Sequence, residues 1–153
     1  MKLKMILSEK KTTGEVFSIP SDAPLREAAA KFCENKAGSL LVTDPDDMPV
    51  HYIGIITEHD IVKKVSEGAT ISELTVADTM QKDLIIATTE DDVDYIMKVM
   101  IRHKIRHVPI LEKSKIVGVI SMGDLMRSKS EADALQIHYL SEYTSGTYGN
   151  KEF

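Results

Sequence analysis

The sequence predicts a mixed α/β (α+β) protein made of two β-α-β-β-α units related by a pseudo-twofold axis. Residues 54–60 and 118–124 both contain a glycine, two aliphatic residues, a hydroxyl residue and, three positions further on, an aspartate. The apolar pattern of residues 25–32 also recurs at 93–100. A unit of about 60 residues is marginal alone. We therefore expect the two units to share a core and to form a cleft where they meet.

The first unit is expected to cover residues 1–70, with strands at 16–19, 39–42 and 52–56. A helix after the first strand has one apolar face, formed by Leu25, Ala28, Ala29 and Phe32. Cys33 lies beside this face, so we interpret it as a small buried side chain rather than a reactive thiol. A closing helix at 58–66 is expected to turn Ile61, Val62 and Val65 inward.

The second unit, residues 71–130, is expected to repeat this order. It starts with a short connecting helix at 75–80, and its strands are predicted at 84–87, 105–111 and 116–121. Its helices are predicted at 90–102 and from 123 onward. Residues 131–153 are expected to begin as a helix and to end as a loose tail at 144–153, where glycines interrupt the pattern.

Composition excludes several classes of function. A net charge of −5 argues against a general nucleic-acid-binding protein, which would need a basic face. No apolar run is long enough to cross a membrane, and the first nine residues do not resemble a secretion signal. The single cysteine permits no intramolecular disulfide, so we expect a cytoplasmic protein.

The repeated hydroxyl and carboxylate residues are the strongest functional signal. Thr57 and Asp60, like Ser121 and Asp124, are expected where a strand ends and a helix begins. A hydroxyl residue followed by an aspartate three positions later commonly caps a helix. Its recurrence at the same point of both units also favours a binding role, because a carboxylate at this corner can accept two adjacent sugar hydroxyls.

These motifs, with residues 75–80 and the strand starting at Arg106-His107, resemble a tandem pair of cystathionine-β-synthase (CBS) domains, also called a Bateman module. The resemblance covers residues 1 to about 130. It implies a stand-alone regulatory protein, not an enzyme, that binds AMP, ADP, ATP, S-adenosylmethionine or NAD in clefts between the repeats. It requires no obligatory cofactor. It also implies a homodimer that senses energy state and signals to a partner protein.

The resemblance also assigns site residues. Asp60 and Asp124 would take the ribose diol, and Thr57 and Ser121 would support ribose or phosphate contacts. Adenine would lie against residues of the opposite unit. These are Ile86, Ala87 and Ile105 for the Asp60 cleft, and Ser18, Ile19, Ala37 and Gly38 for the Asp124 cleft.

Arg106 and His107 match the phosphate-binding positions of the family, and we expect them in the Asp124 cleft. The corresponding Gly38 and Ser39 carry no charge, so the Asp124 cleft is expected to bind more tightly. His59 and Lys36 would compensate in part in the other cleft.

Two alternatives remain at this point. Arg106 and His107 can also be read as the exposed start of a strand, whereas a metal site of His103 and His107 is disfavoured because a helix-to-strand break separates them. The alternative function is an interaction scaffold of the same fold that binds no adenosine ligand.

Overall fold

Two three-stranded sheets, one in each unit, organise the computed structural model, which describes residues 1–10 and 16–144. The first unit contains β1 (Ser18–Pro20), α2 (Leu25–Asn35), β2 (Ser39–Thr43), β3 (Tyr52–Thr57) and α3 (Glu58–Ser66). A short 3-10 turn, η1 (Ile71–Glu73), follows. In the sheet, β2 lies between a parallel β1 and an antiparallel β3.

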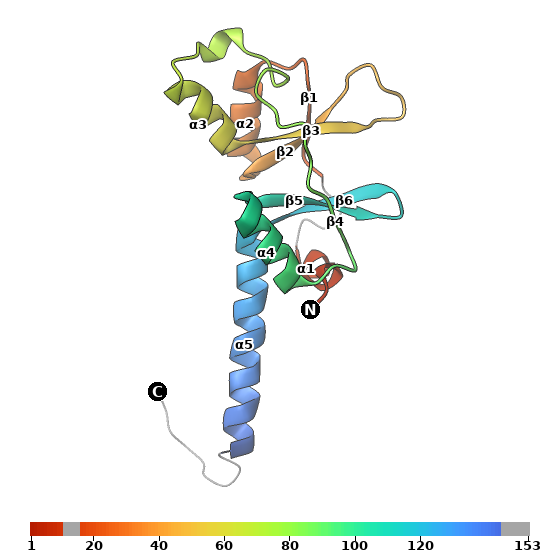
Figure 1. Ribbon diagram of the computed structural model, residues 1–153, viewed down its shortest axis with the longest axis vertical. Coiled ribbons are helices and arrows are strands. Elements are labelled where there is room, and N and C mark those ends of the chain that lie inside the picture. Colours follow the sequence, from red (N-terminus) through yellow and green to blue (C-terminus); the bar gives the residue numbers. More distant parts are fainter. Residues whose placement is uncertain (11–15, 145–153) are drawn as a thin grey trace.

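The second unit repeats this topology. It contains β4 (Ala87–Thr88), α4 (Val93–His103), β5 (His107–Glu112), β6 (Lys115–Ser121) and α5 (Met122–Thr144). The registers match as well, because Ser39 pairs with Thr57 and His107 pairs with Ser121. The predicted repeat is therefore confirmed. Figure 1 shows the two units stacked, with α5 extending away from them.

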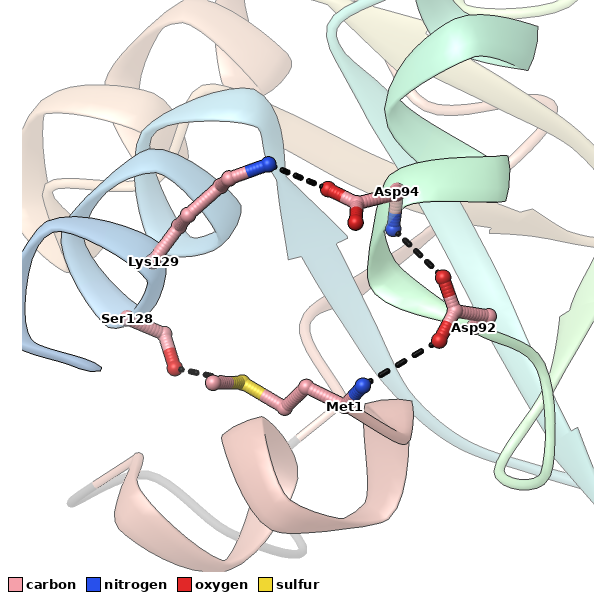
Figure 2. A network of polar contacts seen from close by, with 5 residues as sticks. All are labelled: Met1, Asp92, Asp94, Ser128 and Lys129. Atoms are coloured by element: carbon pink, nitrogen blue, oxygen red, sulfur yellow. Dashed lines mark hydrogen bonds and ion pairs between the residues drawn. The ribbon is translucent and has the colours of Figure 1, made fainter. Parts of the chain in front are cut away.

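An N-terminal helix that the sequence analysis did not predict, α1 (Leu3–Glu9), packs on the second unit. Its Leu3, Ile6 and Leu7 are buried in the core of that unit. In the network of Figure 2, the Met1 amine binds the Asp92 carboxylate at 3.1 Å, and the Ser128 hydroxyl approaches the Met1 sulfur at 3.3 Å. The start of the chain is thus tied to α4 and α5, far away in sequence.

The expected shared core is replaced by two clusters among the described residues. One lies in the first unit around Leu25, Phe32 and Leu40. The other lies in the second unit around Met100, Ile110 and Leu125, and includes the buried face of α1. Each unit therefore has its own apolar interior, and the junction between the units is left for other contacts.

Several local expectations need correction. Val62 and Val65 are 61% and 56% exposed, because the α3 residues that face the sheet are Ile61 and the buried Asp60. Cys33 is exposed, because it lies one residue beyond Phe32 and so points about 100° away from it around the helix.

The ends of other elements also differ from expectation. Residues 75–80 form a bridge and a turn rather than a helix, since the Asp78 carboxylate accepts from the backbone N–H of Thr75 at 2.8 Å. The helix α4 begins at Val93 because Asp92 caps it through the N–H of Asp94. The helix α5 is continuous through Thr144, and the rest of the expected loose tail lies outside the described residues.

The repeated glycines lie where a segment from elsewhere in the chain covers the sheet. A Cβ atom on Gly54 would approach the Gln81 carbonyl oxygen to 2.8 Å and the Met80 sulfur to 2.9 Å. One on Gly118 would approach a methyl group of Leu7 to 2.9 Å. Residues 80–81 therefore cover β3, while α1 covers β6 in the equivalent way.

No helix within the described ranges is both long enough and apolar enough to span a membrane.

Candidate ligand-binding site

A cleft of about 340 Å³ lies at the junction of the two units, within the size range of small-molecule sites. The first unit contributes the residue before β2, part of β3 and the start of α3. The second contributes the chain before β4, the end of α4, the turn that follows it and the start of β5. The lining residues are Gly38, Ile55, Thr57, Glu58, His59, Gln81, Asp83, Leu84, Ile85, His103, Lys104, Ile105, Arg106, His107 and Pro109.

This lining holds two permanent cations, two carboxylates and three histidines that add positive charge when an anion favours their protonated form. The basic residues are His59, His103, Lys104, Arg106 and His107, and the acidic ones are Glu58 and Asp83. Among the residues that the structure describes, none forms an ion pair with Arg106. A planar guanidinium without a carboxylate partner is well suited to bind a phosphate through two hydrogen bonds. The arrangement therefore favours an anionic ligand.

Six of the residues that the sequence analysis assigned to a cleft meet here, namely Gly38, Thr57, His59, Ile105, Arg106 and His107. Leu84 and Ile85 line it in place of the expected Ile86 and Ala87. Ile86 is 45% exposed and Ala87 is buried in the core of the second unit.

The remaining candidates lie outside this cleft. Ser18, Ile19, Ala37, Asp60, Ser121 and Asp124 are not among its lining residues. Ile19 is fully buried in the core of the first unit.

Arg106 and His107 both line the cleft of Thr57, and neither lines the cavity that contains Asp124, although the Asp124 carboxylate lies near enough to act on the charge of His107. The units touch closely here, because a Cβ atom on Gly38 would lie 2.8 Å from His107 Nε2. His107 also pairs with Ser121 in the sheet, so its ring lies between the two repeated motifs. The cleft of Thr57 therefore contains Arg106 and His107, which the sequence analysis expected in the Asp124 cleft.

Asp60 takes part in the capping box of α3 and also contacts Gln81, in the chain between the two units. Its Oδ2 accepts from the Thr57 N–H at 2.8 Å and from the Thr57 hydroxyl at 2.9 Å, which closes a capping box. Its Oδ1 accepts from Gln81 Nε2 at 2.8 Å. Asp60 as a residue is 8% exposed, and a sugar diol could take the place at Oδ1 if the Gln81 amide turned away.

Asp124 has the equivalent position in the second unit. Its Oδ2 accepts from the N–H and the hydroxyl of Ser121, both at 2.8 Å, and lies 2.8 Å from the ammonium of Lys10. Asp124 lines a second cavity of about 370 Å³, between α1 and α5, together with Ile6, Glu9, Lys10, Arg127, Ser128 and Glu131. Both repeated aspartates thus act as helix caps and also receive a side chain from a covering segment.

Burial and neighbouring charges shift the pKa values of two groups at the junction. Burial lowers the pKa of His107, against the opposing effect of the Asp124 and Glu58 carboxylates. Burial alone would raise the pKa of Asp124, but hydrogen bonds from Lys10 and Ser121 outweigh it and lower that pKa overall. The folded protein therefore keeps His107 neutral and Asp124 ionised at lower pH than the unfolded chain does.

We expect the free energy of unfolding to fall as the pH is lowered below the unfolded pKa of His107, near 6.5. In this window the unfolded imidazole binds a proton that the folded one does not, so acid favours unfolding. Asp124 contributes with the same sign below 3.8. Urea unfolding of wild type and His107→Gln between about pH 8 and about pH 5 tests this. Equal pH dependence in the two proteins would contradict the expectation.

Gln81, Asp83, Leu84, Ile85 and Lys104 were not predicted as cleft residues. For Lys104 a signal existed. It ends α4 in the left-handed conformation, with φ 54°, as Lys36 ends α2 with φ 49°, so both lie at one repeated position between a helix and the central strand that follows it. Residues 81–85 carry no motif, and only the course of the chain between the units brings them to the cleft.

Comparison with known proteins agrees with this architecture. The CBS domain family model matches residues 11–67 and 71–131. A CBS-domain containing protein from Agrobacterium tumefaciens has 30% sequence identity and a TM-score of 0.76, covering 84% of this chain and 92% of that one. A mitochondrial CBS domain-containing protein of Arabidopsis thaliana is 28% identical, over 91% of this chain and 68% of the relative.

A third similar protein was solved with a ligand. The CBS domain protein from Pyrobaculum aerophilum, complexed with AMP, has 26% identity and a TM-score of 0.68, covering 81% of this chain and 89% of that one. Two matched repeats, the shared topology of both units and these structural neighbours together settle the family. The chain belongs to the CBS domain family and carries two CBS domains in tandem.

Proposed function

We propose that this protein is a regulatory protein that binds an adenosine nucleotide in the cleft of Thr57, with the phosphate toward Arg106 and His107. The observation that carries the proposal is the cluster of basic side chains at the junction of the two CBS domains. The similar protein from Pyrobaculum aerophilum, complexed with AMP, supports the choice of an adenosine ligand.

The cleft provides a different surface for each part of such a ligand. Arg106 offers the fixed fork of donors that suits a phosphate, and a phosphate near His107 would favour its charged form. Apolar side chains, including Ile55, Leu84 and Ile105, offer the contact area that a purine needs. The ribose would lie near Thr57, and would reach Asp60 only when Gln81 releases it.

We expect AMP to bind at least about tenfold more tightly than adenosine, because a charge-assisted hydrogen bond contributes about 1.5–3 kcal/mol. Isothermal titration of both ligands measures this difference directly. A thermal-shift series with ADP, ATP, NAD and S-adenosylmethionine then ranks the nucleotides, since a ligand at about 100 times its Kd adds about 2.7 kcal/mol of stability. If none of these ligands binds, the interaction-scaffold alternative replaces this proposal.

Regulation requires in addition that the nucleotide binds one conformation or assembly better than another. We place this coupling in a cytoplasmic homodimer that changes its affinity for a partner protein with the supply of nucleotide. Light scattering with and without saturating AMP measures the mass of the assembly. If the mass of the assembly does not change with AMP, the nucleotide would instead act on the affinity for the partner protein alone.

A further inference from the structure

Each CBS domain is covered by a segment that reaches its repeated carboxylate. In the first domain, the backbone of Gln81 forms both hydrogen bonds of a bridge with Ile55, at 2.9 and 2.8 Å, and its side chain binds Asp60. In the second domain, the Lys10 ammonium donates to the Val119 carbonyl at 2.8 Å and binds Asp124. Ile55 and Val119 occupy the same position of the repeated motif, one residue after its glycine. Gln81 and Lys10 are therefore counterparts.

The two counterparts differ in chemistry. The Gln81 amide is neutral, and within residues 1–10 and 16–144 its side chain forms one hydrogen bond, to Asp60. Because its backbone is held separately by Ile55, a rotation of the side chain alone would free Oδ1 of Asp60. Lys10 instead brings a charge to Asp124, whose side chain is 13% exposed, and its ammonium also donates to the Val119 carbonyl. A ribose hydroxyl can replace a neutral donor far more readily than an ammonium in a partly buried ion pair.

The position of Lys10 is fixed by the helix that precedes it. Lys10 is the C-cap of α1, whose Leu3, Ile6 and Leu7 are buried in the second core. At the other end of α1, the Met1 amine binds Asp92 and the Lys4 ammonium binds Glu90, each at 3.1 Å. The helix therefore holds Lys10 at Asp124 as part of the folded domain.

We propose that the Lys10 ammonium occupies the position at Asp124 that a ribose hydroxyl would otherwise take. The chain therefore binds one adenosine nucleotide, in the cleft of Thr57, and not two. The inference rests on the proposed function, because it concerns whether the adenosine nucleotide binds at Asp60 in the cleft of Thr57, at Asp124, or at both. It makes Lys10 the residue that sets the number of nucleotides bound by each chain.

The test is the stoichiometry of AMP and of adenosine, measured by isothermal titration and equilibrium dialysis. Wild type is expected to bind one molecule per chain. Lys10→Met keeps the length of the side chain but removes the charge, and is expected to bind two. Lys2→Met removes an exposed lysine at the N-cap of the same helix, where its side chain forms no cap hydrogen bond, and is the matched control, expected to bind one. In the Lys10→Met background, Asp124→Asn should abolish the second event only.

The outcomes separate this inference from the proposed function. One equivalent in wild type and one in Lys10→Met overturns the role of Lys10 and leaves the proposed function intact, as does two equivalents in wild type. No binding to wild type with one equivalent in Lys10→Met supports Lys10 and overturns the Thr57 cleft as a site. No binding to either protein overturns both.

A second measurement needs no change at Lys10. In the otherwise wild-type chain, Asp124→Asn is expected to leave the AMP affinity within about twofold, whereas Asp60→Asn weakens it about tenfold or more. Comparable losses of AMP affinity in the two variants would show that the wild-type protein also binds AMP at Asp124. This result would overturn the inference even if Lys10→Met failed to fold.

Discussion

Replacement of Leu3 by alanine is expected to lower the free energy of unfolding by about 2–5 kcal/mol, the range of buried leucine truncations. Leu3 is fully buried in the core of the second CBS domain, although it lies near the start of the chain. Met5 lies on the same helix but is 49% exposed, so Met5→Ala is the matched control. We expect a change within about 0.5 kcal/mol for Met5→Ala, and urea unfolding of both variants measures the two values.

Hydrogen exchange then shows which domain depends on Leu3. Because the buried face of α1 packs with Ile110 and Ile120, amides of β5 and β6 should lose protection in Leu3→Ala. Amides of β1 to β3, which surround the first core, should lose less. Equal loss in both sheets would mean that the two cores unfold as one unit, and a loss no larger than that of Met5→Ala would mean that α1 does not support the second domain.

Local sequence signals predicted the parts of the fold that local interactions determine. Thr57 and Asp60 form a capping box within four consecutive residues, and the start of α3 follows from it. The stripe of Leu25, Ala28 and Phe32 is buried as its spacing indicates. The same reasoning failed for Val62 and Val65, because an apolar residue on a short helix reveals its partner only through the tertiary structure.

The candidate site was harder to predict because it combines segments that are distant in the sequence. Periodicity indicates that a face is buried, but it does not identify the segment that covers it. For this reason α1 could not be assigned to the second domain, nor residues 80–81 to the first. The pairing of Arg106 and His107 with Thr57 likewise depends on how the two domains meet, at the contact of His107 with Gly38.

Arg106→Ala is expected to weaken AMP binding by about 10- to 100-fold, because it removes a charged donor worth about 1.5–3 kcal/mol to the phosphate. Arg102 is the matched control. It is exposed in the last turn of α4, four residues earlier, and is not among the residues that line the cleft. Arg102→Ala changes the net charge of the protein equally, so a general electrostatic effect would appear in both variants and a specific phosphate contact only in Arg106→Ala.

Adenosine provides the internal reference for this prediction. It lacks the phosphate, so its affinity should be the same in Arg106→Ala and wild type, and the loss should be confined to AMP. Combining Arg106→Ala with Asp60→Asn or Asp124→Asn then identifies the seam that Arg106 serves, since residues contacting one ligand depart from additivity in a double-mutant cycle. Coupling to Asp60 is expected because Asp60 is hydrogen-bonded to Thr57, which lines the same cleft as Arg106. Coupling to Asp124 instead would mean that Arg106 binds the phosphate of a ligand held at Asp124, and would contradict the assignment of Arg106 to the Thr57 cleft.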